Sequence, residues 1–292
     1  MARHPHHRAL AGEARHAFGR ESADRSGIHG STFLALGGVD SSHVTTEIGQ
    51  VEALFRYPVK SMAGESLDEA NLGWHGLDGD RRLAFRKTRD RSDFPWLIAS
   101  KLPDMLRFTP IRREQGVHVE QPSHVRTPDG RELAVFGDEL ATEVEVRHGA
   151  PVQMMELKQG VFDEACVSVI AVDTVREIES AAGTNPDVRR FRPNIVLRLL
   201  RPGPFQEDQW VGGVLSFGDV GQGPSISVTI RDVRCSMLNL DPDSARSNPE
   251  VLKAAVRMNE NTAGIYGTVI RCGRLAVGQT VRLRVSVDAE ST

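Results

Sequence analysis

One cysteine stands at a place where a thiolate could do chemistry. Apolar residues alternate with polar ones over residues 226–231, the two-residue period of a half-buried strand, and Cys235 comes at the end of that strand. Arg231 and Arg234 are close in the sequence, and a cationic neighbour favours the thiolate, the form that binds a soft metal or attacks sulfur. A free cysteine is also a common core residue, so the position alone leaves both roles open.

Two further segments carry groups that suit an anion. Lys60 and Ser61 follow a predicted strand, where an ammonium and a hydroxyl can hold a phosphate by charge and by hydrogen bond. Residues 189–194 place three arginines within four residues ahead of a proline, whose stiff backbone presents Arg192 and Asn194. A solvated lysine at a strand end and a solvated basic face are the ordinary alternatives.

Strand patterns dominate the elements that must position these residues. Helices are predicted over 173–183, with Asp173 as N-cap, and over 250–258, with Ser247 as the capping residue; Asp138 begins a possible helical turn. The pattern predicts a mainly β fold with a few helices, of the α+β class. Strands are predicted near residues 50–57, 67–72, 81–85, 117–119, 133–136, 144–146, 167–170, 195–199, 226–235 (with Ile226, Val228 and Ile230 on one face), 268–271 and 279–285.

Length and composition bound the domain organisation. The 292 residues suit two globular units and a tail. Residues 1–47 hold six of the ten histidines and no sustained periodicity, so we expect a disordered N-terminal extension rather than a metal site. The ordered domains are predicted at 48–150 and 151–287, with the boundary where periodicity lapses.

Charge and cysteine usage exclude several classes of protein. A net charge of −3 and a pI of about 6.4 disfavour a general nucleic-acid binder. The apolar patch at 33–36 is too short for a membrane span or a signal peptide, so no membrane association is expected. Three cysteines form neither a metal-finger pattern nor an even disulfide framework, which favours a reducing, cytoplasmic location. Cys166 and Cys272 are expected to pack without chemistry.

Three motifs resemble one known family. RCSMLNLDPDS, a helix and AGIYGTVIRCGRLAVGQTVRL resemble the MOSC domain, the module named for the C-terminal part of molybdenum cofactor sulfurase. YPVKSMAGES and GLDGDRRLAF resemble the N-terminal β-barrel domain that precedes it in the branch containing the mitochondrial amidoxime-reducing component, and FRPNI resembles a second signature of the family. The resemblance covers about Ile48 to Leu283 and implies two β-barrel-like domains with a cofactor groove between them.

The resemblance also assigns roles to individual residues. It makes Cys235 the molybdenum ligand or the sulfur carrier, and it makes Lys60, Ser61 and Arg81 the residues that hold the phosphate and pterin of the molybdenum cofactor (molybdopterin). Arg192 and Asn194 are the pterin contacts, whereas Arg189 and Arg190 have no such role.

The assignment of three parts of the expected site needs separate comment. Because successive strand residues face opposite ways, only one of Arg81 and Arg82 should reach the site, and we choose Arg81. Tyr266 stands where relatives line the pocket, with packing between hairpins as the equal alternative. Glu164 and Ala165 occupy positions where relatives carry serine or threonine, a departure from the family pattern.

The function implied by this resemblance is a molybdenum-dependent oxidoreductase that reduces N-hydroxylated small molecules. Electrons must come from a separate flavin, haem or iron–sulfur protein, because three cysteines are too few for a cluster and no glycine-rich dinucleotide motif is present. The alternative is a sulfur-carrier or cofactor-handling protein with a persulfide on Cys235. A cofactor-storage module is the third and weakest reading.

Overall fold

The computed structural model describes residues 43–113 and 121–286. Most of the predicted N-terminal extension and the predicted strand at 117–119 lie outside these residues. Residues 43–47 belong to the first strand instead of the extension. No helix in the described ranges has the length and apolarity needed to cross a membrane.

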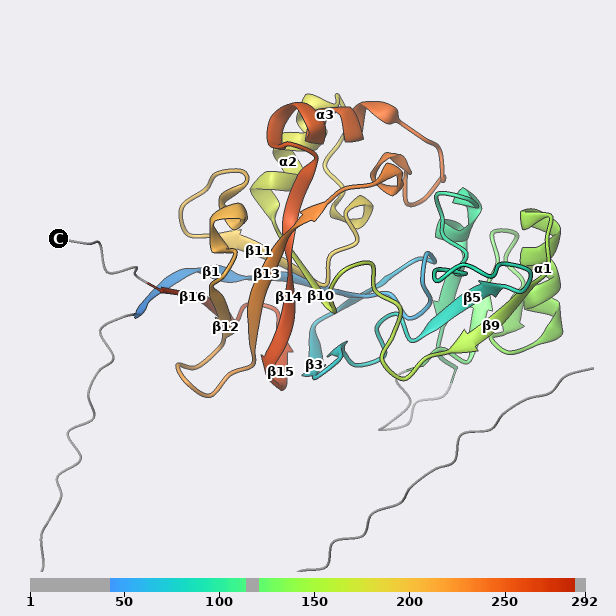
Figure 1. Cartoon of the computed structure of the whole chain (residues 1–292), viewed down its shortest axis with the longest axis horizontal. Helices are drawn as coiled ribbons and strands as arrows, with labels where there is room; N and C mark the ends of the chain where they lie inside the picture. The colour runs from blue at the N-terminus through green and yellow to red at the C-terminus, as the bar shows by residue number, and fades with distance from the viewer. Residues whose placement is uncertain (1–42, 114–120, 287–292) are drawn as a thin grey trace, which may run out of the picture. The chain divides into compact units, whose positions relative to one another are not determined.

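A closed barrel of seven strands organises the chain, in the order β11-β10-β14-β13-β12-β16-β1, with β1 pairing back onto β11 (Figure 1). Pairs in the barrel are antiparallel except β10 and β11, and helix α2 supplies the crossover that a parallel pair requires. The mainly β class is confirmed. The barrel strands are β1 (His43–Arg56), β10 (Val167–Ala171), β11 (Ile195–Leu199), β12 (Val214–Phe217), β13 (Ser225–Val233), β14 (Thr262–Arg271) and β16 (Thr280–Ser286).

Short strands and three α-helices complete the described part. Strand β2 (Glu65–Leu67) extends the barrel sheet beside β1. The small sheets are β15 (Gly273–Ala276) with β3 (Glu69–Gly73) and β4 (Gly76–Leu77), β5 (Leu83–Lys87) with β9 (Val152–Glu156), and β6 (Thr109–Ile111) with β7 (His124–Arg126) and β8 (Glu132–Ala134). The helices are α1 (Asp138–His148), α2 (Val172–Ala181) and α3 (Pro249–Asn259), with single-turn 3₁₀ helices η1 (Pro103–Arg107), η2 (Val188–Arg190), η3 (Gln206–Trp210) and η4 (Ser236–Asn239).

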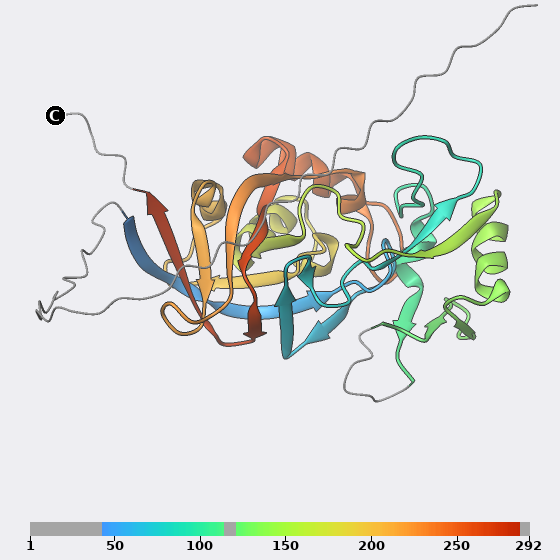
Figure 2. The ribbon, with the colours of Figure 1, turned by 60° about the horizontal axis from the view of Figure 1, so that its bottom comes forward.

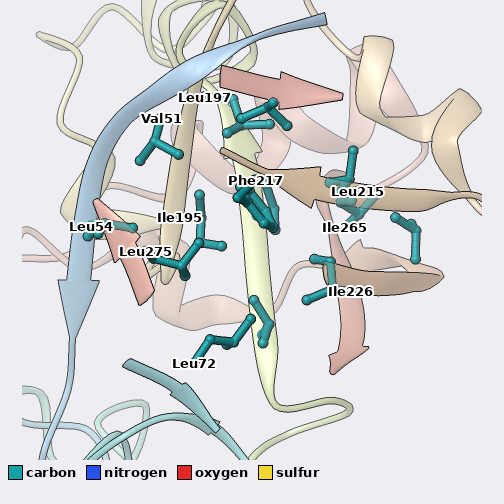
Figure 3. Packing of buried hydrophobic residues seen from close by; sticks show 14 of the residues in the cluster. Val51, Leu54, Leu72, Ile195, Leu197, Leu215, Phe217, Ile226, Ile265 and Leu275 are labelled. Atoms are coloured by element: carbon teal, nitrogen blue, oxygen red, sulfur yellow. The ribbon is translucent and has the colours of Figure 1, made fainter. Parts of the chain in front are cut away.

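The barrel interior is filled by alternate residues of its strands. Leu215 and Phe217 of β12 are fully buried, while Val214 and Ser216, which alternate with them, are only partly buried. Val51, Ile195 and Phe217 are among the side chains that gather in this interior (Figure 3). Apolar residues from the range 59–152, together with Leu240, form a second cluster. A third cluster lies between the barrel and helices α2 and α3.

Strand β1 precedes the predicted boundary near residue 150, yet it is a barrel strand. It pairs with β16 over His43 to Gln50 and with β11 over Gly49 to Leu54. Its blue ribbon curves along the barrel and leads directly into the segment that carries Lys60 (Figure 2). The first part of the chain therefore shares a core with the second.

Three local expectations were wrong. Residues 144–146 lie in α1 rather than in a strand, because Leu140 and Val144 are one helical turn apart and pack on the same side. Helix α3 is capped by Asn248 instead of Ser247. Asp173 lies inside α2, where its carboxylate accepts a hydrogen bond from the Gly203 N–H instead of capping the helix.

The position of β1 in the barrel core yields a stability prediction. Leu54→Ala removes a fully buried side chain and should lower the free energy of unfolding by about 2–5 kcal/mol. The same change at Leu200, which is 63% exposed, should alter it by less than about 0.5 kcal/mol. Urea denaturation of both variants measures the difference; equal losses would contradict the placement of β1.

Candidate functional site

One pocket of about 390 Å³ opens at the end of the barrel where β13 stops. Six of the seven predicted site residues line it: Lys60, Ser61, Arg81, Arg192, Cys235 and Tyr266. Asn194 does not. The remaining lining residues are Ile98, Asp163, Glu164, Arg190, Phe191, Asp232, Val233, Arg234, Met237 and Leu238.

Cys235 is exposed and lies two residues beyond the end of β13, as the first residue before the short helix η4. The strand does not alternate evenly up to this point. Ile226 and Val228 are buried, but Ile230 is 40% exposed because the register with β14 shifts between Val228 and Ile230. Such bulges re-aim the residues that follow them. Here the residue that turns inward is Asp232, which is buried.

The two arginines near the cysteine have different roles from those expected. Arg231 forms ion pairs with Asp208 and Glu260 at 3.0 Å each and does not line the pocket. The Arg234 guanidinium is buried and held in place, since it donates to the carbonyl oxygens of Phe191 and Ala263. Arg234 thereby fixes the backbone next to Cys235 against two neighbouring segments.

Buried cations line the same pocket as the cysteine. The Lys60 ammonium is 2.8 Å from the Asp163 carboxylate and 3.3 Å from the Val161 carbonyl oxygen. Burial lowers the pKa of Lys60, and the neighbouring Asp163 carboxylate opposes that shift. Burial also lowers the pKa of Arg192, to about 10, with a contribution from the positive charge of Arg81. Arg192 therefore remains charged at neutral pH.

Both of these guanidinium groups stack on one aromatic ring. Arg81 and Arg192 lie 4.8 and 4.2 Å from the centroid of the Tyr57 ring. Arg81 also donates to the Arg192 carbonyl oxygen at 3.0 Å, and Arg192 donates to the Met62 carbonyl oxygen at 2.8 Å. The Nη2 atom of Arg192 is buried without a hydrogen-bond partner among the described residues. This arrangement suits an anion, because the cations are fixed and incompletely satisfied.

Backbone strain is concentrated in the same wall. Ser61, Arg81 and Arg192 have φ values of 69°, 51° and 51°, in the left-handed region that side chains other than glycine rarely adopt. They come from three separate segments, and each such residue costs about 1–3 kcal/mol. Only seven non-glycine residues in the described ranges have positive φ. Strain that is gathered at one pocket is a typical mark of a functional site.

The left-handed backbone also explains why Arg81 and not Arg82 faces the pocket. Strand alternation was the wrong reason, because β5 begins only at Leu83. The turn at Arg81 directs its side chain into the pocket, while Arg82 donates to the carbonyl oxygens of Lys158 and His75 outside it.

Asn194 is buried behind the pocket wall. Its amide oxygen accepts from the Ser168 N–H at 3.1 Å, and its amide nitrogen donates to Asp80 Oδ2 at 3.0 Å and to the Phe55 carbonyl oxygen. Both ends of the amide are therefore engaged within the protein. In this structure Asn194 acts on the pocket through Asp80 and Ser168.

Asp80 was not anticipated, although it is the centre of these contacts. Its carboxylate is fully buried and accepts from the Tyr57 N–H at 2.7 Å, from Asn194 and from Arg81. The sequence offers little signal for it, because aspartate in Gly-Asp is ordinary turn chemistry. Asp163 and Asp232 were also missed. Asp232 could have been noticed, because it continues the two-residue spacing of Ile226, Val228 and Ile230 with a carboxylate.

Arg189 and Arg190, which precede Phe191, pair with the aspartates of the Asp-Pro-Asp segment. Arg189 makes a bidentate pair with Asp243 at 2.8 and 2.7 Å, and Arg190 is 2.8 Å from Asp241. Asp241 also accepts from Ser244 within its own turn. The Asp-Pro-Asp segment after Cys235 is thus tied to the segment that carries Arg192, which gives these arginines a positioning role.

Two family models match the chain. The profile of the MOSC domain matches residues 144–282, and the profile of the MOSC N-terminal beta barrel domain matches residues 48–164. The chain is a MOSC domain protein. The pocket draws Lys60, Ser61 and Arg81 from the MOSC N-terminal match and Cys235 from the MOSC match. The domain boundary at 150 stays a prediction, since the two matches overlap over 144–164.

Solved structures show more distant likenesses. The YUAD protein from Bacillus subtilis is 13% identical, with 84% of this chain and 98% of that chain covered and a TM-score of 0.46. YiiM from Geobacillus stearothermophilus is 18% identical, with 43% of this chain and 56% of that chain covered and a TM-score of 0.33. Likenesses at this level carry no argument about function. No curated protein matches the chain.

The strained backbone at Arg192 gives a paired test. Glycine adopts positive φ freely, so Arg192→Gly should be more stable than Arg192→Ala by about 1 kcal/mol. At Arg189, which lies in η2 and is absent from the positive-φ residues, glycine should instead be the less stable of the two. Thermal and urea unfolding of the four variants measures both orders. The same order at both positions would contradict the strain at Arg192.

The buried amide of Asn194 gives a second test. Asn194→Asp places a carboxylate against Asp80 and should lower the free energy of unfolding by at least about 2 kcal/mol at pH 7. The loss should shrink towards pH 4, because one of two adjacent carboxyls then takes up a proton. Asn185→Asp, on an exposed residue, serves as the control. A loss independent of pH would argue against the Asp80 contact.

Proposed function

We propose that this MOSC domain protein binds the molybdenum cofactor and uses it to reduce N-hydroxylated compounds. The observation that supports the proposal most strongly is that an exposed thiol and several buried cations line one pocket, where a guanidinium nitrogen of Arg192 has no hydrogen-bond partner among the described residues. The ligand such a pocket suits has a soft metal at one end and an anionic group at the other. The family takes its name from molybdenum cofactor sulfurase, which points to the same ligand.

The residues present fit that cofactor. The Cys235 thiolate would hold the molybdenum, and Lys60 and Ser61 would bind the phosphate. Arg81 and Arg192, pre-positioned on the Tyr57 ring, would contact the phosphate and the pterin. Five cationic side chains and three carboxylates line the pocket, so its balance favours an anion. Tyr266 lines the same wall and would border the substrate; Asn194 would act through Asp80.

An arriving phosphate would compete with one contact already present. Asp163 holds the Lys60 ammonium at 2.8 Å, yet 67% of the Asp163 side chain is exposed. The Lys60 ammonium is itself buried, so it needs a counter-charge whenever Asp163 moves away. A bound phosphate would take over that role, and the exposed Asp163 side chain could then turn towards solvent.

The proposed reaction consumes two electrons and two protons and converts a hydroxylamine-type N–OH group into N–H and water. When bound, the cofactor supplies the two-electron chemistry. A separate flavin, haem or iron–sulfur protein would return the electrons. The pocket residues bind the substrate, orient its N–OH group and provide exchangeable protons.

A sulfur-carrier function is the second candidate. The exposure of Cys235 favours it, because a persulfide carrier must present its terminal sulfur to another protein. The pocket contains no other cysteine, so any persulfide formed there would have no neighbouring thiol in the lining to attack it.

Metal and pterin analysis of the freshly purified protein separates the two functions. Wild type should carry about one molybdenum and one pterin per chain if the cofactor is resident, and Cys235→Ala should lose the metal. Cys272→Ala, a change outside the pocket, should retain both. Cyanide-releasable sulfur without molybdenum or pterin would instead identify the carrier and would remove the reductase from consideration.

A further inference from the structure

One buried carboxyl group in the pocket has no role in binding the cofactor. Asp232 is the penultimate residue of β13 and is 2% exposed, yet it lines the pocket together with Cys235 and Tyr266. The register with β14 shifts between Val228 and Ile230 and again between Arg231 and Val233, and these bulges set its inward direction. A carboxylate is rarely buried at such a position unless it is paired or functional.

Only one of its two oxygens is held by the protein. Oδ2 accepts from Ser168 Oγ at 3.2 Å and lies 3.0 Å from Arg234 Nη1. No described residue donates a hydrogen bond to Oδ1, and Oδ1 is absent from the solvent-shielded atoms that lack a partner. The free oxygen is therefore presented to the pocket by an otherwise fixed side chain.

The charges around Asp232 come from several elements. Arg234 follows it in the chain, Arg81 and Asp163 face it across the pocket, and Tyr266 neighbours it on β14. Burial raises the pKa of Asp232 to about 6, against the opposing effect of Arg234. Burial, followed by the nearby Asp232 carboxylate, also raises the pKa of Tyr266, so that phenol stays protonated at neutral pH.

We propose that Asp232 is the catalytic acid of the pocket, and that it donates a proton to the hydroxyl oxygen of a bound N–OH substrate. This inference rests on the proposed reductase function. The N–O bond breaks and a new O–H bond forms from the Asp232 proton, so the oxygen leaves as water. Two electrons come from the reduced cofactor, which two successive one-electron transfers from the separate electron carrier have reduced. The nitrogen takes its proton from solvent, and solvent then reprotonates Asp232.

One substitution distinguishes proton donation by Asp232 from structural support of Arg234. An asparagine at position 232 retains an acceptor oxygen for Ser168 and Arg234 but has no proton to give. Glu164→Gln is the matched control, because Glu164 is an exposed carboxylate lining the same pocket. Each variant loses one carboxyl from the lining, and only one of the two should affect proton delivery.

Two measurements on full-length, cofactor-loaded protein test the proposal. Reduction of benzamidoxime is followed against pH with dithionite-reduced methyl viologen as electron donor, and carboxyl protonation is followed by infrared difference spectroscopy between wild type and Asp232→Asn. Because the acid form is required, the wild-type rate should fall as pH rises above about 6. Asp232→Asn should lose at least about 100-fold in rate and lose that pH dependence, with molybdenum content unchanged. Glu164→Gln should keep the pH dependence.

The outcomes distinguish this inference from the function on which it rests. A carboxyl band that titrates near pH 6 and disappears in Asp232→Asn, together with the lost rate, supports the proposal. It is overturned if wild type turns over and Asp232→Asn keeps its rate and pH profile, or if the band titrates near pH 4. Loaded wild type that reduces no N-hydroxylated compound overturns the reductase function and the acid role together.

Discussion

The site depends on one buried carboxylate, that of Asp80. It has no access to solvent, and its two oxygens accept hydrogen bonds from Tyr57, Arg81 and Asn194, which belong to three separate segments. An unpaired charge at this depth would be strongly unfavourable. The carboxylate therefore requires these three donors, and its hydrogen bonds in turn hold the donors in position. Because one donor is Arg81, this pairing also directs a cation into the pocket.

From Asp80 a series of polar contacts leads to Arg234, the residue before the cysteine. Asn194 links Asp80 to the Ser168 backbone, and the Ser168 hydroxyl donates to Asp232. Asp232 pairs with Arg234, whose next neighbour in the chain is Cys235. Residues from both halves of the chain are therefore positioned by one polar network. Removing one member of such a network would leave its buried partners unpaired.

The sequence predicted what depends on local pattern. The strands at β1, β10, β11 and β16 and the helices α2 and α3 follow from periodicity over a few residues. The motifs also directed attention to six residues that now line one pocket. What periodicity could not supply was the register: the exposure of Ile230 and the burial of Asp232 depend on bulges formed with β14. The role of Asp80 could not be predicted from periodicity either, since its partners come from elsewhere in the chain.

The closure of the barrel by β1 has a consequence for how the protein is made. Strand β1 begins at His43 and pairs with β16, which ends at Ser286, so nearly the whole described chain separates the two partners. Pairings between such distant segments form late and slowly. On the ribosome, the barrel cannot close until β16 has left the exit tunnel, long after Lys60 and Cys235 have emerged. The pocket itself includes Tyr266 of β14, so it too is complete only after the C-terminal part of the barrel has been made.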